Sequence, residues 1–249
     1  MKKLFKSCFG ALLFTVCIFH SLFADSKNIV YSNTFDFSTI DSLNISLTYE
    51  NLKVSRIYGD EIIVEIGSNN IKKIPDVIIQ EETLIIQSKE QKVVRGNKCT
   101  VYIYLPQDFN AQSIELHNVS GNISADILQA QNAVLISNVS GRTDINTCKT
   151  ELFTVTSVSG NNTLQKITAD YFELSATSGH IFAELEQAPQ ASSMISNISG
   201  KTQLYYPKDS NLEIIAFSIA GTNYHKSIGT DGPQLSITSV SGKIEVVEY

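Results

Sequence analysis

A tetrapeptide ending in glycine recurs seven times in the second half of this 249-residue chain, and it limits the possible folds more than any other feature. The copies read NVSG, NVSG, SVSG, ATSG, NISG, SIAG and SVSG. Their glycines, spaced by 20, 19, 19, 21, 21 and 21 residues, are Gly121, Gly141, Gly160, Gly179, Gly200, Gly221 and Gly242. A fixed period of this length is typical of repeat proteins whose units stack on one another.

The segments between the glycines predict strands and no helix. Stretches such as AVLISNV and LFTVTSV are β-branched and alternate with a period of two. Repeated strands of one orientation with no helix between them are best accommodated by coils that stack. We therefore expect an all-β fold, a single-stranded parallel β-helix (β-solenoid) with about 20 residues per coil. The general preference of parallel crossovers makes it right-handed.

Aligning the copies on their glycines predicts which positions face the interior. The residues five before the glycine, such as Ile136, and four after it, such as Ile145, are mostly aliphatic. The residues two before the glycine are also expected to be buried, and they are Val119, Val139, Val158, Thr177, Ile198, Ile219 and Val240. Because two of these inward positions are three apart, we expect a bend or bulge between them, at the polar position held by Asn138.

The first half of the chain lacks the tetrapeptide but is also rich in alternating segments. Gly59 precedes Gly121 by 62 residues, close to three coils, so residues 25–110 are expected to continue the solenoid as degenerate coils. Residues 111–249 would then hold the regular repeats of the same domain. A separate small β-sandwich over 25–110 is the alternative.

The N-terminus has the layout of a secretory signal peptide. Three lysines precede an uncharged apolar stretch from about residue 7 to 19, and Ala24 supplies a small residue before the expected cleavage site. We expect residues 1–24 to be removed and the protein to be exported to the periplasm or the cell surface; an uncleaved anchor is the alternative. Cys99 and Cys148 would then be the remaining cysteines, either bridged or present as two buried thiols.

The composition excludes several classes of protein. With 43% hydrophobic and 18% charged residues, the chain is not a disordered polyelectrolyte. Its 19 basic residues against 25 acidic ones give a net charge of −6, which argues against nucleic acid and against an anionic membrane as partners.

The repeat also predicts that no catalytic or metal-binding group is assembled. Asp126 and Glu184 share a column, but they are three coils apart, and His117, His180 and His225 occupy different columns. The chain has no GxSxG nucleophile motif and no phosphate-binding loop. We expect no catalytic residue, no metal site and no cofactor, so that the chain is not an enzyme.

Exposed aromatic residues and the chain end are the remaining candidates for binding. Phe182, Tyr205, Tyr206 and Tyr224 are expected in outward or edge columns, where they could hold a protein or a glycan of the cell surface; packing beneath a loop is the alternative. Because the last coil ends at Tyr249 without a covering helix, self-association through an open C-terminal coil is a further expectation.

The repeats resemble those of a bacterial putative adhesin family of unknown function, whose units carry Ser-Gly-x-Ile. The unit occurs here as Ser120-Gly121-Asn122-Ile123, Ser178-Gly179-His180-Ile181 and Ser241-Gly242-Lys243-Ile244, within a likeness covering about 40–249. The resemblance implies an extracytoplasmic β-helix without established chemistry. The sequence thus predicts an exported, non-enzymatic binding or scaffold module of the cell envelope; the alternatives are a carbohydrate-active β-helix enzyme and a self-assembling structural protein.

Overall fold

The computed structural model describes residues 28–89, 98–220, 224–228 and 232–249, and for 224–228 it describes the strand without its side chains. The expected signal peptide, Gly221 and the side chain of Tyr224 therefore lie outside the described residues. In the part of the chain that is described, no helix is long and apolar enough to cross a membrane.

The chain folds almost entirely into strands, which confirms the all-β expectation. The two 3-10 helices, η1 (Phe37–Thr39) and η2 (Ile71–Lys73), have three residues each. The strands form one 14-stranded sheet around a common core. They are β1 (Ile29–Asp36), β2 (Ser42–Leu47), β3 (Asn51–Ile57), β4 (Glu61–Ser68), β5 (Asp76–Gln80), β6 (Thr83–Gln87), β7 (Cys99–Pro106), β8 (Ala111–Asn118), β9 (Ile123–Ser140), β10 (Thr143–Leu185), β11 (Ser193–Tyr206), β12 (Leu212–Ser218), β13 (Tyr224–Ile228) and β14 (Gln234–Glu248).

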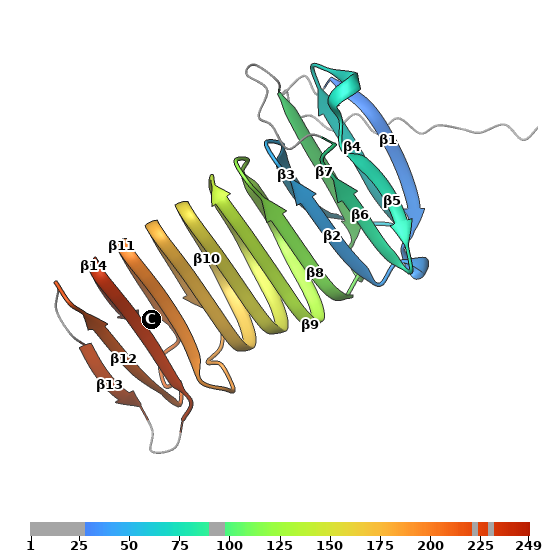
Figure 1. Cartoon of the computed structure of the whole chain (residues 1–249). Coiled ribbons are helices and arrows are strands. Elements are labelled where there is room, and N and C mark those ends of the chain that lie inside the picture. Colours follow the sequence, from blue (N-terminus) through green and yellow to red (C-terminus); the bar gives the residue numbers. More distant parts are fainter. Residues whose placement is uncertain (1–27, 90–97, 221–223, 229–231) are drawn as a thin grey trace, which may run out of the picture.

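The long strands bend around the core, so each coil contributes one segment to each of two faces (Figure 1). We call face 1 the face made by segments before the glycines, such as β8, and face 2 the face made by segments after them, such as 200–206 of β11. Neighbouring coils pair in parallel: Ser157 lies beside Asn138, and Gly179 lies beside Gly200. Equivalent positions of successive repeats are therefore neighbours in space.

The corner between the two faces differs from the expectation in one respect: its inner and outer columns are exchanged. The valine column two before the glycine faces solvent, with Val139 42% exposed, whereas Asn138 beside it is 1% exposed. No bulge is needed, because alternation from Ile136 to Asn138 continues inward without interruption. The prediction that the valine column is buried was wrong.

Hydrogen bonds explain why asparagine occupies the inside of the corner. The Nδ2 of Asn138 donates to the carbonyl oxygen of Gly121 in the neighbouring coil at 3.3 Å, and to the Thr143 hydroxyl at 3.3 Å. Asn197 bonds to Gly179 and Thr202 in the same way. A buried carbonyl that turns a corner needs such a donor, since leaving it unpaired is costly.

One coil reverses this polar pair without losing it. Ser157 stands at the position that Asn138 and Asn197 hold in their coils, and Asn162 stands five residues later, at the position of Thr143 and Thr202. The Nδ2 of Asn162 donates to the Ser157 hydroxyl at 2.8 Å. In these three coils the inside of the corner holds a hydrogen-bonded polar pair, and we call the row of inward polar side chains at the corner the polar ladder.

The glycines form a row because no other residue fits between the coils. A Cβ built on Gly160 would overlap the carbonyl oxygen of Gly141, and one on Gly179 would overlap that of Gly160. Gly160 also has a φ of +156°, which an L residue rarely adopts. The row runs through Gly121, Gly141, Gly160, Gly179, Gly200 and Gly242.

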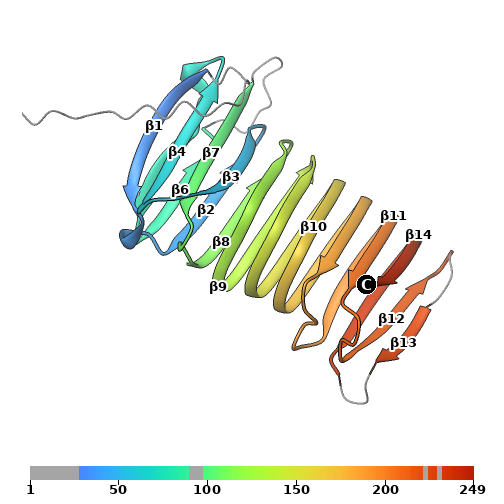
Figure 2. The ribbon, with the colours of Figure 1, turned by 180° about the vertical axis from the view of Figure 1, so that it is seen from behind.

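The order of the coils at the C-terminal end differs from their order in the chain. On face 1, β14 lies between β11 and β12, so Gly200 neighbours Gly242 although their repeats are not consecutive in the chain (Figures 1 and 2). Beyond β12, β13 pairs in the antiparallel direction and ends the sheet. The C-terminal coil is thus not the outermost element on face 1.

The N-terminal end is interlocked in a similar way. The coil made by β2 and β3 lies between the coil of β6 and β7 and the coil that begins with β8, although it precedes both in the chain. Strands β1, β4 and β5 are antiparallel additions and not degenerate coils. Gly59 lies in the turn between β3 and β4, so its spacing of three coils from Gly121 is coincidental.

Candidate functional site

The most distinctive surface of the molecule is a row of exposed β-branched side chains along the corner. Its aliphatic members are 42% to 70% exposed. We call it the corner ridge, and it comprises Val119, Val139, Val158, Thr177, Ile198, Ile219 and Val240. Contiguous apolar surface on a soluble protein usually marks a contact site, whereas isolated exposed apolar residues are ordinary.

The ridge is held straight by hydrogen bonds between coils. The Ser140 amide donates to the carbonyl oxygen of Val119 at 2.8 Å, and the Ser178 hydroxyl donates to that of Val158 at 3.2 Å. With neighbouring coils about 4.8 Å apart, the five steps from Val119 to Val240 span roughly 24 Å. The ridge is therefore a rigid line of side chains whose spacing the backbone sets.

Basic residues flank the ridge on the side of face 2. The position after each glycine carries Arg142, His180, Lys201 or Lys243 in four of the described coils, and no acid occupies it in any coil. Acids begin two residues further on, where Glu245 contacts Lys201 at 2.9 Å. A partner on the ridge would thus meet aliphatic side chains bordered by positive charge.

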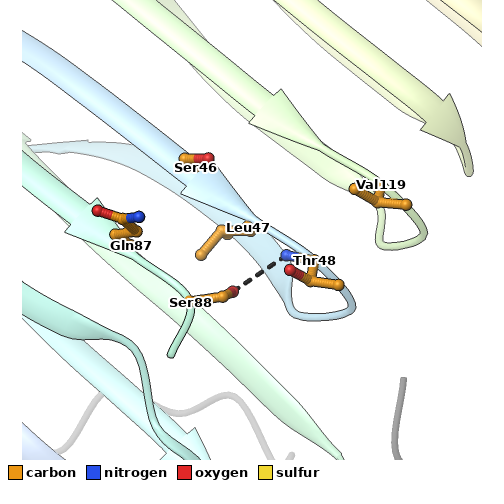
Figure 3. Close-up of a pocket in the computed structure, with 6 residues that line it drawn as sticks. All are labelled: Ser46, Leu47, Thr48, Gln87, Ser88 and Val119. Atoms are coloured by element: carbon orange, nitrogen blue, oxygen red, sulfur yellow. Dashed lines mark hydrogen bonds between the residues drawn. The ribbon is translucent and has the colours of Figure 1, made fainter. Parts of the chain in front are cut away.

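A polar depression of about 350 Å³ lies at the N-terminal end of the ridge, where the coil of β2 and β3 meets β6 (Figure 3). It is lined by Ser46, Leu47, Thr48, Gln87, Ser88 and Val119. Val119 belongs to both the depression and the ridge, so the two form one continuous surface. The Thr48 amide donates to the Ser88 hydroxyl at 3.0 Å and fixes one wall.

A buried carboxylate supports this depression. Glu50 is 1% exposed, and its Oε2 accepts the amides of Thr48 and Tyr49 at 3.0 Å each and the Ser88 hydroxyl at 2.7 Å. Its carbonyl oxygen accepts from Asn118 Nδ2 at 2.8 Å. It also lies where a Cβ on Gly121 would be. Glu50 thus occupies the place of a further member of the glycine row and ends the polar ladder.

The aromatic residues expected at the surface are only partly there. Phe182 and Tyr205 are half-buried neighbours on the outer side of face 2, with ring centroids 5.1 Å apart. Tyr206 is completely buried, because the next residue along an alternating strand points inward, so it was wrongly placed on the surface. The side chain of Tyr224 lies outside the described residues.

Both cysteines of the described chain are buried and free, so the bridge that the sequence left open is absent between Cys99 and Cys148. Burial raises the pKa of the Cys148 thiol. Burial, followed by the charge of Glu50, raises the pKa of the Cys99 thiol to about 12, against a smaller opposing effect of Ser68. Neither thiol is a nucleophile at neutral pH, since the thiolate is the reactive form.

We expect iodoacetamide at pH 8 to leave both thiols of the native protein unmodified and to alkylate both in 6 M guanidinium chloride. Because the folded pKa values are raised, the free energy of unfolding is unaffected below the ordinary thiol pKa and falls as the pH rises above it. Peptide mass spectrometry resolves the two sites. A disulfide-linked peptide pair, or modification of the native protein, would contradict the assignment.

Within the described residues no group of three or more His, Cys, Asp or Glu side chains is placed to hold a metal ion. The two acids that share a column, Asp126 and Glu184, are three coils apart, or roughly 14 Å. That exceeds the ~6.5–9.5 Å over which paired carboxylates hydrolyse a glycosidic bond.

Comparison with protein-family models shows which family the chain belongs to. The model of the Toastrack DUF4097 family matches residues 40–248. The chain belongs to this family. The family is one of unknown function, and its span agrees with the likeness expected from the Ser-Gly units. No curated protein matches the chain significantly.

The solved structures to which this Toastrack protein is similar have low sequence identity and TM-scores below 0.5. A putative adhesin from Bacteroides fragilis is 15% identical, with 90% of this chain and 98% of that chain covered and a TM-score of 0.45. A putative lipid binding protein from Parabacteroides distasonis is 11% identical, with 87% and 96% covered and a TM-score of 0.44. A putative cell adhesion protein from Clostridium sporogenes is 10% identical, with 88% and 99% covered and a TM-score of 0.39.

Sequence reasoning missed the surface part of this site. The uniform β-branched character of the ridge column was visible, but it was interpreted as core. The alternation of the strand is the signal that would have corrected this interpretation. Ile136 and Asn138 are two residues apart, so they point to the same side of the strand, and Val139 points to the other. Nothing local indicated Glu50, because its place beside Gly121 follows only from the pairing of β3 with β9.

Proposed function

We propose that this Toastrack protein is an exported, non-enzymatic binding or scaffold module of the cell envelope, and that the corner ridge is its contact surface. The observation that supports this most is the ridge itself: a rigid, in-register row of aliphatic side chains left in solvent. Each such side chain gains about 1.5 kcal/mol or more when a partner buries it. A row of them therefore supplies the driving force of a contact site.

The partner that this surface favours is a protein or glycan of the cell surface. The basic residues beside the ridge favour neutral or acidic groups, and the polar depression at one end offers hydroxyl and amide groups for hydrogen bonds. The N-terminal charge and hydropathy pattern supports export. The separation of Asp126 from Glu184 supports a role without catalysis. The finer architecture we propose is a right-handed, single-stranded β-helix of about 20 residues per coil.

The test compares two sets of variants on a glycan and envelope-protein array. The triple variant Val139→Ser, Val158→Ser and Ile198→Ser removes the middle of the ridge, and we expect binding to weaken tenfold or more. The control, Met194→Ser with Ile78→Ser, removes exposed apolar side chains of face 1 away from the ridge and should bind as the wild type does. Both sets should unfold at the wild-type temperature, since exposed substitutions change stability by only about 0.5 kcal/mol.

Two results would refute the proposal. One is equal binding by the ridge variant and the control. The other is turnover of a polysaccharide that is abolished by replacing one acid, such as Asp126→Asn. Edman sequencing of the protein purified from the periplasm tests export, because a cleaved signal peptide predicts a new N-terminus close to residue 25.

A further inference from the structure

The two halves of β14 have different surroundings. Its first half, 234–239, is paired on both sides, with β11 and with β12. Its second half, 242–247, lies on face 2 and pairs with β11, and no other described strand pairs with it. Face 2 therefore ends at a strand edge that is parallel, regular and in register with every coil before it.

The interior is unfinished at this edge. Ile244 and Val246 occupy inward positions, but they are only partly buried and pack against the margin of the core. Their partners in the neighbouring strand, Thr202 and Leu204, are 1% and 0% exposed. One more strand on face 2 would bury Ile244 and Val246 as the regular coils bury their equivalents.

The shape of this end fits a single strand better than a second copy of the molecule. Among the described strands, face 1 continues past β14 through β12 and β13, while face 2 ends at β14 (Figure 2). A second copy approaching end-on would meet β12 and β13 before it reached β14. An extended segment can lie against the edge of β14, beside the overhang of face 1.

The outward side chains of the edge alternate in charge. Lys243 and Glu245 both project from the outer side of face 2, with Val247 after them. Lys201, through a hydrogen bond and its charge, lowers the pKa of Glu245, so this carboxylate is ionised at neutral pH. A strand that places an acid beside Lys243 and a base beside Glu245 is complementary, because opposite charges on adjacent strands attract.

We propose that the outer edge of β14 at 242–247 binds an extended segment of another polypeptide by strand addition. The segment presents aliphatic residues to Ile244 and Val246, an acid to Lys243 and a base to Glu245. Backbone hydrogen bonds supply the affinity, and the alternate side chains supply the selectivity. This site is separate from the corner ridge, so either can exist without the other.

The test uses two fluorescein-labelled peptides of equal composition, Ser-Gly-Glu-Ile-Lys-Val-Thr and Ser-Gly-Lys-Ile-Glu-Val-Thr. In the parallel register of the coils, the first places Glu beside Lys243 and Lys beside Glu245, and the second reverses both charges. We expect fluorescence anisotropy to show about tenfold tighter binding of the first peptide. Its binding should slow hydrogen exchange of amides within 242–247 on the full-length protein.

Two variants locate the site. Val246→Lys places a charge on the inward side of the edge and should abolish binding, whereas Val247→Lys, one residue along and outward, should keep it. Equal binding of both peptides, or no slowing of exchange within 242–247, overturns the proposal. So does a concentration-dependent dimer in analytical ultracentrifugation that Val246→Lys dissociates, because the occupant would then be a second copy. The exchange measurement needs no variant and remains decisive if Val246→Lys fails to fold.

Discussion

Replacing Gly160 with alanine is expected to lower the free energy of unfolding by about 4 kcal/mol. The new Cβ would overlap the carbonyl oxygen of Gly141, and the φ of +156° is unfavourable for an L residue. Gly160 lies in the middle of the row, with Gly141 on one side and Gly179 on the other, so neither coil can move away without breaking its own pairing. Urea unfolding followed by far-ultraviolet circular dichroism measures the loss.

Gly59 provides a matched control for the backbone part of that effect. It has a φ of +133°, but a Cβ built on it has no heavy atom within 4 Å. We expect Gly59→Ala to cost about 1–2 kcal/mol, the strain of the conformation alone. Equal losses for Gly59→Ala and Gly160→Ala would mean that the coils are not closely packed at the glycine row.

Replacing Glu50 with alanine is expected to cost about 3–5 kcal/mol. The carboxylate is buried and accepts three hydrogen bonds, so its removal takes this acceptor from the Tyr49 amide and the Ser88 hydroxyl and leaves the Thr48 amide only the Ser88 hydroxyl. It would also loosen the junction between the coil of β2 and β3 and the coil of β6 and β7, because Ser88 directly follows β6. Differential scanning calorimetry should show the change as a fall in Tm.

Two further variants, Glu50→Gln and Glu61→Ala, test whether the loss of stability comes from the buried hydrogen bonds of Glu50. The glutamine keeps one acceptor oxygen in place, so we expect a loss of about 1–2 kcal/mol. Glu61 is exposed on β4, and its removal should change stability by no more than about 0.5 kcal/mol. If Glu50→Ala were as mild as Glu61→Ala, the hydrogen bonds that the Glu50 carboxylate accepts would not stabilise the fold.

The corner shows how one hydrogen-bonded column decides the character of a surface. Once Asn138 and Asn197 turn inward to bond glycine carbonyls of the neighbouring coil, alternation forces the next residue outward. That residue is β-branched in every coil, which suits extended backbone. The apolar ridge is therefore a consequence of the polar column on the inside of the corner.

At both ends of the molecule, one coil occupies a place in the stack that differs from its order in the chain. At one end β14 lies between two strands that precede it, and at the other the coil of β2 and β3 lies between two that follow it. A terminal coil held on both sides cannot fray as readily as a last coil held on one side. On face 2, however, the second half of β14 is held on one side, and this is where we place strand addition.

The sequence by itself determined the strand content, the period of the repeat and the positions where only glycine fits, because each of these follows from residues at fixed spacing within one unit. Only the tertiary structure decided that Asn138 is inside and Val139 outside, since the carbonyl that selects asparagine belongs to the neighbouring coil. It alone also decided that Gly242 neighbours Gly200. The repeats ending in SIAG and SVSG are nearly alike, so their order along the stack depends on how the connections run and not on which residues they contain.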